Sequence, residues 1–215
     1  MKHNIQNKTT CYFLIIIFLS ISNINLFTQQ SKESLYKNLE KKYGNIKSIS
    51  FDYSMKEFPE NKGSMKAKEG NKYIIKLTKR QIYSNGKTIW NVTHQDKKVV
   101  ISELEVSDSK TITYENFFFD FFDLYKPKSL TKENSSKGQQ KYILTLVPEP
   151  YDKDGTLDII KVGVDIKSLG INYLQFINGK ETQTFEIKNI SINPKLSDKV
   201  FEYVPEKDYD VIDLR

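Results

Sequence analysis

Most of this sequence alternates apolar and polar residues with a period of two, the pattern of β-strands that bury one face only. Such strands must cover the apolar face with a second sheet, with helices, or by curling toward a barrel. Little of the chain shows a helical period, so we predict a mainly β, α+β fold: an unclosed antiparallel barrel or half-barrel of about 10–11 strands in meander order, with a few helices over its concave face. The predicted strands are residues 49–56, 63–69, 72–77, 80–83, 87–92, 97–102, 141–147, 158–166, 172–176, 181–187 and 201–204.

Local signals indicate how these strands connect. Asn-Gly pairs at 85–86 and 178–179 predict two tight hairpins, of the type that needs positive φ at both central residues. The apolar parity that Phe185 and Ile187 establish switches before Ile190, which predicts a bulge or break near Asn189.

One amphipathic helix precedes the strands. Leu35, Leu39 and Tyr43 recur at every fourth position, which predicts a helix over Lys32–Tyr43, and Gly44 ends it.

A phenylalanine-rich segment interrupts the strands in the middle of the chain. Five phenylalanines fall within residues 117–122, although the mean hydropathy of the chain is −0.54 and 28% of its residues are charged. Exposing one large apolar side chain costs roughly 1.5–3 kcal/mol, so either the protein's own core or a ligand must cover these rings. Five aromatic residues of this segment fall at helical spacing, with Asp120 and Asp123 on the polar side: Tyr114, Phe118, Phe121, Phe122 and Tyr125. Phe117 and Phe119 widen the apolar arc beyond what a simple surface helix requires. We interpret this segment as a lid helix that Pro127 keeps from extending, facing the sheet when empty and a ligand when loaded.

The amino terminus predicts export. Lys2 and Lys8 precede an apolar run of eleven residues, 11–21, which is too short to span a bilayer comfortably. We expect a signal peptide at 1–28, cleaved somewhere in 20–30, although an uncleaved anchor is the alternative. The mature chain, 29–215, is then a single domain with no cysteine and with His94 as its one histidine.

The sequence motifs of common catalytic, phosphate-binding and metal-binding sites are incomplete or absent in this chain. A phosphate-binding loop ending at 86–88 would need glycine at position 81, which is glutamine, and a calcium loop starting at Asp152 would need glutamate where Gly163 stands. No Gly-x-Ser-x-Gly elbow is present, no thiol survives processing, and His94 alone supplies no histidine cluster for a metal. We therefore predict a protein that is not an enzyme, with no cofactor, and we do not expect an exported protein to bind nucleic acid.

Several short motifs resemble the periplasmic outer-membrane lipoprotein carrier family (LolA-like). They are Gly63-x-Met65-x-Ala67-Lys68, Tyr73-x-Ile75, Tyr83-Ser-Asn-Gly-Lys-Thr-Ile-Trp90 with Val99 following, and the closing Phe201-Glu-Tyr-Val-Pro-Glu with Val211-Ile-Asp213. The order of signal, amphipathic helix and long strand is also similar. The resemblance covers nearly the whole mature chain.

The resemblance implies a function as well as a fold. A LolA-like protein is a monomeric periplasmic carrier whose cavity, between an open barrel of about eleven strands and its lid, takes the acyl chains of lipoproteins. It would collect acylated lipoproteins from an ATP-driven release complex of the inner membrane and deliver them to an acceptor at the outer membrane. The alternative is that the same fold serves as an envelope sensor or as a carrier of another lipid or amphiphile.

One departure from the family pattern puts the lid trigger and the usual acceptor in doubt. Many members carry Arg-Pro after the glycine-led strand, where the arginine couples lid closure to cargo. Here these positions are Glu69-Gly70.

The candidate lipid-binding residues follow from strand parity and from the lid interpretation, and for each strand residue plain core packing is the alternative. The facing of Trp90 is open, because Ile89 and Val92 on the same strand are both apolar. The candidates are Phe51, Tyr53, Met55, Ile75, Trp90, Phe118, Phe121, Phe122, Tyr125, Val162 and Val164.

Overall fold

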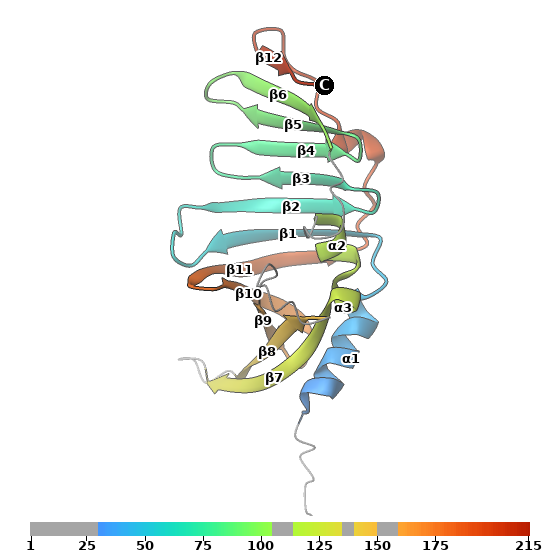
Figure 1. The fold of residues 1–215 in the computed structure, drawn as a ribbon, viewed down its shortest axis with the longest axis vertical. Helices are drawn as coiled ribbons and strands as arrows, with labels where there is room; N and C mark the ends of the chain where they lie inside the picture. Colours follow the sequence, from blue (N-terminus) through green and yellow to red (C-terminus); the bar gives the residue numbers. More distant parts are fainter. Residues whose placement is uncertain (1–29, 105–113, 135–139, 150–158) are drawn as a thin grey trace, which may run out of the picture. The chain divides into compact units, whose positions relative to one another are not determined.

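One sheet of twelve strands runs through the part of the chain that the computed structural model describes, which is residues 30–104, 114–134, 140–149 and 159–215. The strand order is β12-β6-β5-β4-β3-β2-β1-β11-β10-β9-β8-β7, so β12 and β7 lie at opposite ends and the sheet is unclosed, as predicted (Figure 1). The strands are β1 (Ser48–Met55), β2 (Lys62–Lys68), β3 (Lys72–Lys76), β4 (Gln81–Asn85), β5 (Thr88–Thr93), β6 (Lys98–Glu103), β7 (Tyr125–Asn134), β8 (Gln140–Pro148), β9 (Ile159–Asp165), β10 (Gly170–Asn178), β11 (Glu181–Ile192) and β12 (Asp210–Asp213).

These elements belong to one of two compact units of the chain, Ser31–Arg215. The other unit, Met1–Gln30, contains the predicted signal peptide, which lies outside the described residues. None of the described helices is long and apolar enough to cross a membrane.

The strand register sorts the side chains onto two faces. We call the face that carries Ile49, Phe51 and Tyr53 of β1 the inner face, and its opposite the outer face. Because residues directly opposite one another in neighbouring strands point to the same side, Met65 of β2 and Ile187 of β11 also lie on the inner face. Three helices pack against it: α1 (Lys32–Tyr43), α2 (Tyr114–Phe119) and α3 (Phe121–Leu124).

The first helix has the predicted bounds. The Ser31 hydroxyl accepts a hydrogen bond from the Ser34 amide at 3.1 Å and caps its start, and the Gly44 amide donates to the carbonyl of Glu40 at its end. Leu35 and Leu39 are buried against the inner face. Local periodicity and capping were therefore enough to place α1.

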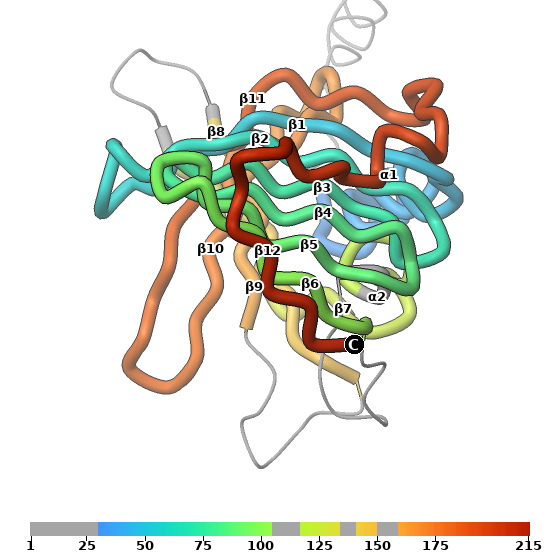
Figure 2. Tube along the Cα trace, turned by 90° about the horizontal axis from the view of Figure 1, so that it is seen from above, coloured from blue at the N-terminus to red at the C-terminus, as the bar shows by residue number. Residues whose placement is uncertain are grey.

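The last segment of the chain, 193–215, crosses the outer face of β1–β6 (Figure 2). The predicted strand over 201–204 is wrong, because Phe201 ends a 3-10 helix, η1 (Asp198–Phe201), and the residues after it are irregular. Phe201 is fully buried and Tyr203 packs against the β5–β6 core. The alternation of apolar and polar residues over 201–204 thus reflects a segment that lies on the sheet. The C-terminal segment joins the sheet only at β12, which pairs parallel with β6, whereas the predicted meander is antiparallel throughout.

One long strand, β7, was not predicted. Its three lysines and Pro127 hide the strand pattern, but β7 lies at the edge of the sheet and pairs with β8 alone, where a proline and charged residues are tolerated. The register shifts between Pro127 and Ser129, as expected where a residue lacks an N–H for the ladder.

The predicted hairpins and the predicted irregularity occur, with one difference in turn geometry. Only the glycine of each Asn-Gly pair, Gly86 or Gly179, has positive φ, so the turns are not of the expected type. At Asn189, φ is 54° and the β1–β11 register shifts, which confirms the break in parity.

Gly63 in β2 makes room for a side chain of the inner face. A Cβ at this position would lie 1.8 Å from the carbonyl oxygen of Lys76 and 2.8 Å from the Tyr53 hydroxyl, which itself lies 3.4 Å from that oxygen. Tyr53 can cross β2 and reach β3 only because position 63 has no side chain.

We predict that Gly63→Ala destabilises the protein, because the added methyl group must displace backbone or Tyr53. Overpacking of this kind typically costs about 1–3 kcal/mol. Urea denaturation should show a loss of about 2 kcal/mol, while Ser64→Ala on the same strand serves as the control and stays close to the wild type. An unchanged midpoint for Gly63→Ala would contradict the close approach.

Candidate functional site

Six aromatic side chains from four elements, β1, β10, β11 and α2, form a closed circle of ring contacts on the inner face. Phe51 contacts Tyr53, and the contacts continue through Phe185, Phe176, Phe117 and Phe118 back to Phe51. Neighbouring centroids lie 5.0–6.5 Å apart, within the range of favourable aromatic contacts. All six side chains are half-buried. We call this set the aromatic circle.

The sheet register and α2 bring the circle together. Met55 of β1 lies opposite Phe185 of β11, and Phe185 lies opposite Leu174 of β10, so the aromatics of three strands share one face. Helix α2 supplies Phe117 and Phe118, which close the circle over β1 and β10. Figure 1 shows α2 beside β1.

The rest of the inner face divides into two parts. Under α1, the sheet is filled: Leu144 and Ile160 are fully buried there, together with the predicted site residues Tyr125, Val162 and Val164. Around α2, every member of the circle is only half-buried. The part under α1 is therefore more completely covered than the part around α2.

The structure brings some of the predicted site residues together and separates others. Phe51, Tyr53 and Phe118 belong to the aromatic circle, Met55 lies next to it, and Ile75 is buried in the core that Phe118 packs against. Phe121 and Phe122 belong to α3 and contact Tyr125 and Tyr36 at 5.0 and 5.4 Å.

Trp90 lies on the outer face, away from the other predicted residues. It pairs with Tyr83 across β4 and β5 and packs in the core that the C-terminal segment covers. Because both faces of β5 carry apolar residues, the alternation in the sequence could not decide which face of the sheet Trp90 lies on.

Three members of the circle were not among the predicted site residues. Phe117 was seen only as a widening of the apolar arc of the lid. Phe185 carried a usable signal, because its parity matches that of Ile187 in the same strand. Phe176 had no local signal that pointed to the site, since its partner Phe185 is fixed only by the β10–β11 hairpin.

The predicted lid helix is broken into two pieces. Asp120, with φ −110° and ψ 14°, separates α2 from α3, and Tyr125 begins β7 where a single helix was expected to continue. The break lets Phe117 and Phe118 turn to the aromatic circle while Phe121 and Phe122 turn to α1 and β7.

A tyrosine of α1 holds α3 in place. The Tyr36 hydroxyl lies 2.8 Å from the carbonyl oxygens of both Phe122 and Tyr125, and Lys126 also donates to Phe122 at 2.9 Å. Burial raises the pKa of Tyr36 to about 12, because the phenolate would lose its hydration, so the hydroxyl stays a donor at neutral pH. α3 is thereby tied to the filled half of the inner face.

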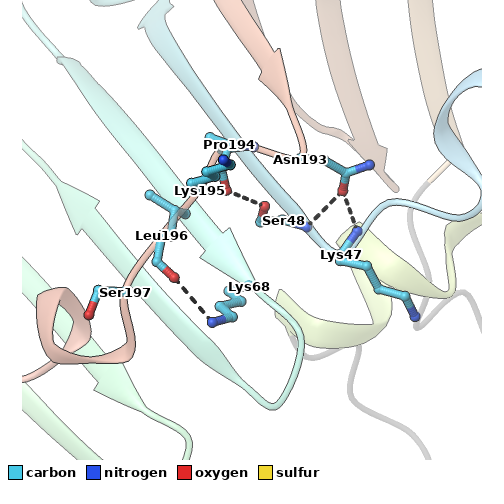
Figure 3. Close-up of a pocket in the computed structure, with 8 residues that line it drawn as sticks. All are labelled: Lys47, Ser48, Lys68, Asn193, Pro194, Lys195, Leu196 and Ser197. Carbon is cyan, nitrogen blue, oxygen red and sulfur yellow. Dashed lines mark hydrogen bonds between the residues drawn. The ribbon is translucent and has the colours of Figure 1, made fainter.

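A pocket of about 640 Å³ lies on the outer face, beneath the start of the C-terminal segment (Figure 3). Lys68 donates to the carbonyl of Leu196 and forms an ion pair with Asp198. Hydrogen bonds from Lys68 and Lys72 lower the pKa of Asp198 to about 2. Ser48 donates to the carbonyl of Pro194. These bonds fasten the segment to β1 and β2. The lining residues are Lys47, Ser48, Lys68, Asn193, Pro194, Lys195, Leu196 and Ser197.

The chemistry that the aromatic circle supplies is burial and dispersion. Its side chains offer apolar ring faces and edges, and Tyr53 alone among the six carries a polar group. Among the described residues, no group of three or more histidine, cysteine, aspartate or glutamate side chains is placed to hold a metal ion. Such a surface favours a flexible apolar ligand.

Comparison with known proteins identifies one family. The model of the family described as outer membrane lipoprotein carrier protein LolA matches residues 45–204. No curated protein matches the sequence. Among solved structures, a conserved protein from Thermus thermophilus has 12% identity and a TM-score of 0.49, over 86% of this chain and 99% of the other. A LolA superfamily protein from Nitrosomonas europaea has 13% identity and a TM-score of 0.40, over 81% and 98%.

We predict that Tyr36→Phe loosens α3 without unfolding the sheet. The variant loses the hydroxyl that both carbonyl groups approach, at an expected cost of about 1–2 kcal/mol. Hydrogen exchange should quicken at residues 121–126 and remain unchanged in β1–β5.

Tyr43→Phe is the matched control, since the Tyr43 hydroxyl donates to Leu169 at 3.0 Å from the far end of the same helix. Equal exchange of 121–126 in both variants would contradict the assigned role of Tyr36.

Proposed function

This chain belongs to the LolA family of outer membrane lipoprotein carrier proteins, and we propose that it carries lipoproteins by binding their acyl chains at the aromatic circle. The proposed site of action is the periplasm, where a monomer takes acylated lipoproteins from an ATP-driven release complex of the inner membrane. It delivers them to an acceptor at the outer membrane.

The observation that carries this proposal is the half-buried state of the aromatic circle. A core that served stability alone would be expected to bury its large rings as fully as Tyr125 or Leu144 is buried under α1. Four partly exposed rings of the strands, together with two rings of the six-residue helix α2, instead form a surface with spare capacity for apolar contact. An acyl chain gains about 0.8 kcal/mol for each methylene that it buries.

Moderate affinity suits a carrier of this kind. A lipoprotein with two or three acyl chains is stably anchored in a bilayer, so its release needs an upstream source of energy. The carrier must then bind tightly enough to shield the chains and loosely enough to give them up. A surface that starts half-covered by α2 meets both conditions, because the ligand exchanges one apolar cover for another.

The trigger for opening differs from that of family members with Arg-Pro after the glycine-led strand. Glu69 pairs with Lys47 at 2.7 Å, and both side chains lie in the turns at the start of β1 and the end of β2. We propose that α2 opens about the break at Asp120 while Tyr36 retains α3. An acyl chain therefore competes with Phe117 and Phe118 for the strand aromatics.

We predict that Phe118→Ser and Phe185→Ser each lower acyl-chain binding about tenfold, since each removes part of a ring surface from the circle. Binding is measured with a fluorescent fatty-acyl probe, and far-ultraviolet circular dichroism checks the sheet. Tyr83→Ser is the control, because Tyr83 is equally half-buried but lies on the outer face. Loss of binding in the control alone would place the ligand elsewhere.

The natural cargo is identified by isolating the protein from the cell envelope and analysing the bound lipid by mass spectrometry. Diacylated or triacylated lipoprotein supports the proposed carrier. A free lipid or glycolipid would instead assign the same fold to another amphiphile, and turnover of an ester substrate would contradict a purely carrying role.

The single tryptophan provides a second test. Trp90 faces away from the circle, so we predict that acyl chains brominated along their length leave its fluorescence unquenched. In a Trp90→Phe, Phe118→Trp variant, the same chains should quench strongly, since quenching requires contact. Quenching of Trp90 in the parent protein would contradict the placement of the site on the inner face.

A further inference from the structure

The turn between β1 and β2 exposes an aromatic side chain at the end of the sheet. Among the described residues, the exposed large apolar side chains are Phe58, Val200, Val204, Val211 and Leu214, and Phe58 is the one aromatic. It is 53% exposed, at the tip of a turn closed by the Asn61 amide, which donates to the Phe58 carbonyl at 2.8 Å. An exposed phenylalanine on an ordered turn is a feature that folding does not require.

The neighbouring β3–β4 turn lies against this tip. The Thr78 hydroxyl lies 2.9 Å from the carbonyl of Glu60 and 3.4 Å from that of Lys62, so the two turns are joined. We call residues 56–62 and 77–80 the docking tip. Figure 2 shows the β1–β2 hairpin projecting beyond the ends of the strands.

The docking tip carries unpaired positive charge. The two joined turns carry four exposed cations, and within the described part of the chain none of them forms an ion pair: Lys56, Lys62, Lys79 and Arg80. The tip also holds two exposed acids: Glu57, whose carboxylate accepts a hydrogen bond from the Thr184 amide at 3.2 Å, and Glu60. With four cations and two acids, the formal net charge of the tip is 4 − 2 = +2. By contrast, Lys47, Lys68 and Lys72 at the other end of the sheet are paired with Glu69 or Asp198.

The tip is continuous with the aromatic circle. The inner-face residues Phe51, Tyr53 and Met55 of β1 lead directly toward Phe58, three positions beyond Met55. An acyl chain that enters between the tip and a lipid layer would meet apolar side chains along the whole of β1.

We propose that the docking tip binds an anionic lipid surface, with Phe58 in the interface and the four cations at the lipid phosphates. An exposed aromatic on turns that also carry lysine and arginine is suited to the boundary between headgroups and acyl chains, and each cation near an anionic surface adds to the attraction. This inference names the membrane as a partner of the proposed carrier and rests on that function for the role of the β1 path.

The test is cosedimentation of the exported, processed chain with lipid vesicles, since the apolar segment 11–21 would itself bind lipid. The parent protein should bind vesicles rich in phosphatidylglycerol at low salt, and bind weakly at high salt or to phosphatidylcholine alone. Lys79→Glu with Arg80→Glu should lower partitioning at least about tenfold, and Phe58→Ser about fivefold.

Matched controls alter the same chemistry elsewhere. Lys37→Glu with Lys87→Glu makes the same change in net charge at two exposed lysines outside the tip, and Val204→Ser removes a side chain that is 84% exposed. Both controls should partition like the parent protein. If tip and control variants lose binding equally, or if the parent protein binds no anionic vesicles, the docking proposal is overturned.

Binding of the fluorescent acyl probe without vesicles separates this proposal from the carrier function. Tip variants should keep probe binding, because the aromatic circle is unchanged. Vesicle binding without any probe binding would remove the carrier function and leave the docking tip, whereas probe binding without vesicle binding would do the reverse.

Discussion

The need to cover one apolar face of a large open sheet governs this structure. Twelve strands present an inner face, and the described helices that pack on it have twelve, six and four residues. α1 is long enough to bury its part completely, as the full burial of Leu35 and Leu144 shows. α2 is too short to do the same for the aromatic side chains of β1, β10 and β11, so those rings stay half-covered. Incomplete cover is thus a direct consequence of helix length.

Features that depend on neighbouring residues could be predicted from the sequence. The spacing of Leu35 and Leu39, with Gly44 as the end, placed α1 correctly, and strict alternation placed Val162 and Val164 on the buried face of β9. The parity switch at Asn189 was visible for the same reason. In each case, the periodicity within one helix or strand determines which of its residues lie on the apolar face.

Features that depend on distant partners could not be predicted. The facing of Trp90 is decided by Tyr203 and Tyr209, more than one hundred residues later, which cover the outer face of an evenly apolar strand. Pro127 and the lysines of β7 are explained only by its position at the sheet edge. Phe176 joins the candidate site through ring contacts with Phe185 and Phe117, which the strand order and α2 create.

The two pieces of the lid are held by different forces, and this difference determines which piece can exchange its contacts with a ligand. α3 is tied through Tyr36, whose hydroxyl approaches the carbonyl groups of both Phe122 and Tyr125, so displacing α3 gives up that donor at a cost of about 1–2 kcal/mol. The described side chains of α2 are Phe117, Phe118 and Phe119, which bind the sheet by burial and dispersion. In the proposed carrier function, an acyl chain would supply the same kind of contact that these three side chains give up. Exchange at α2 would then depend on the difference between two apolar contacts, which suits the reversible binding that we propose.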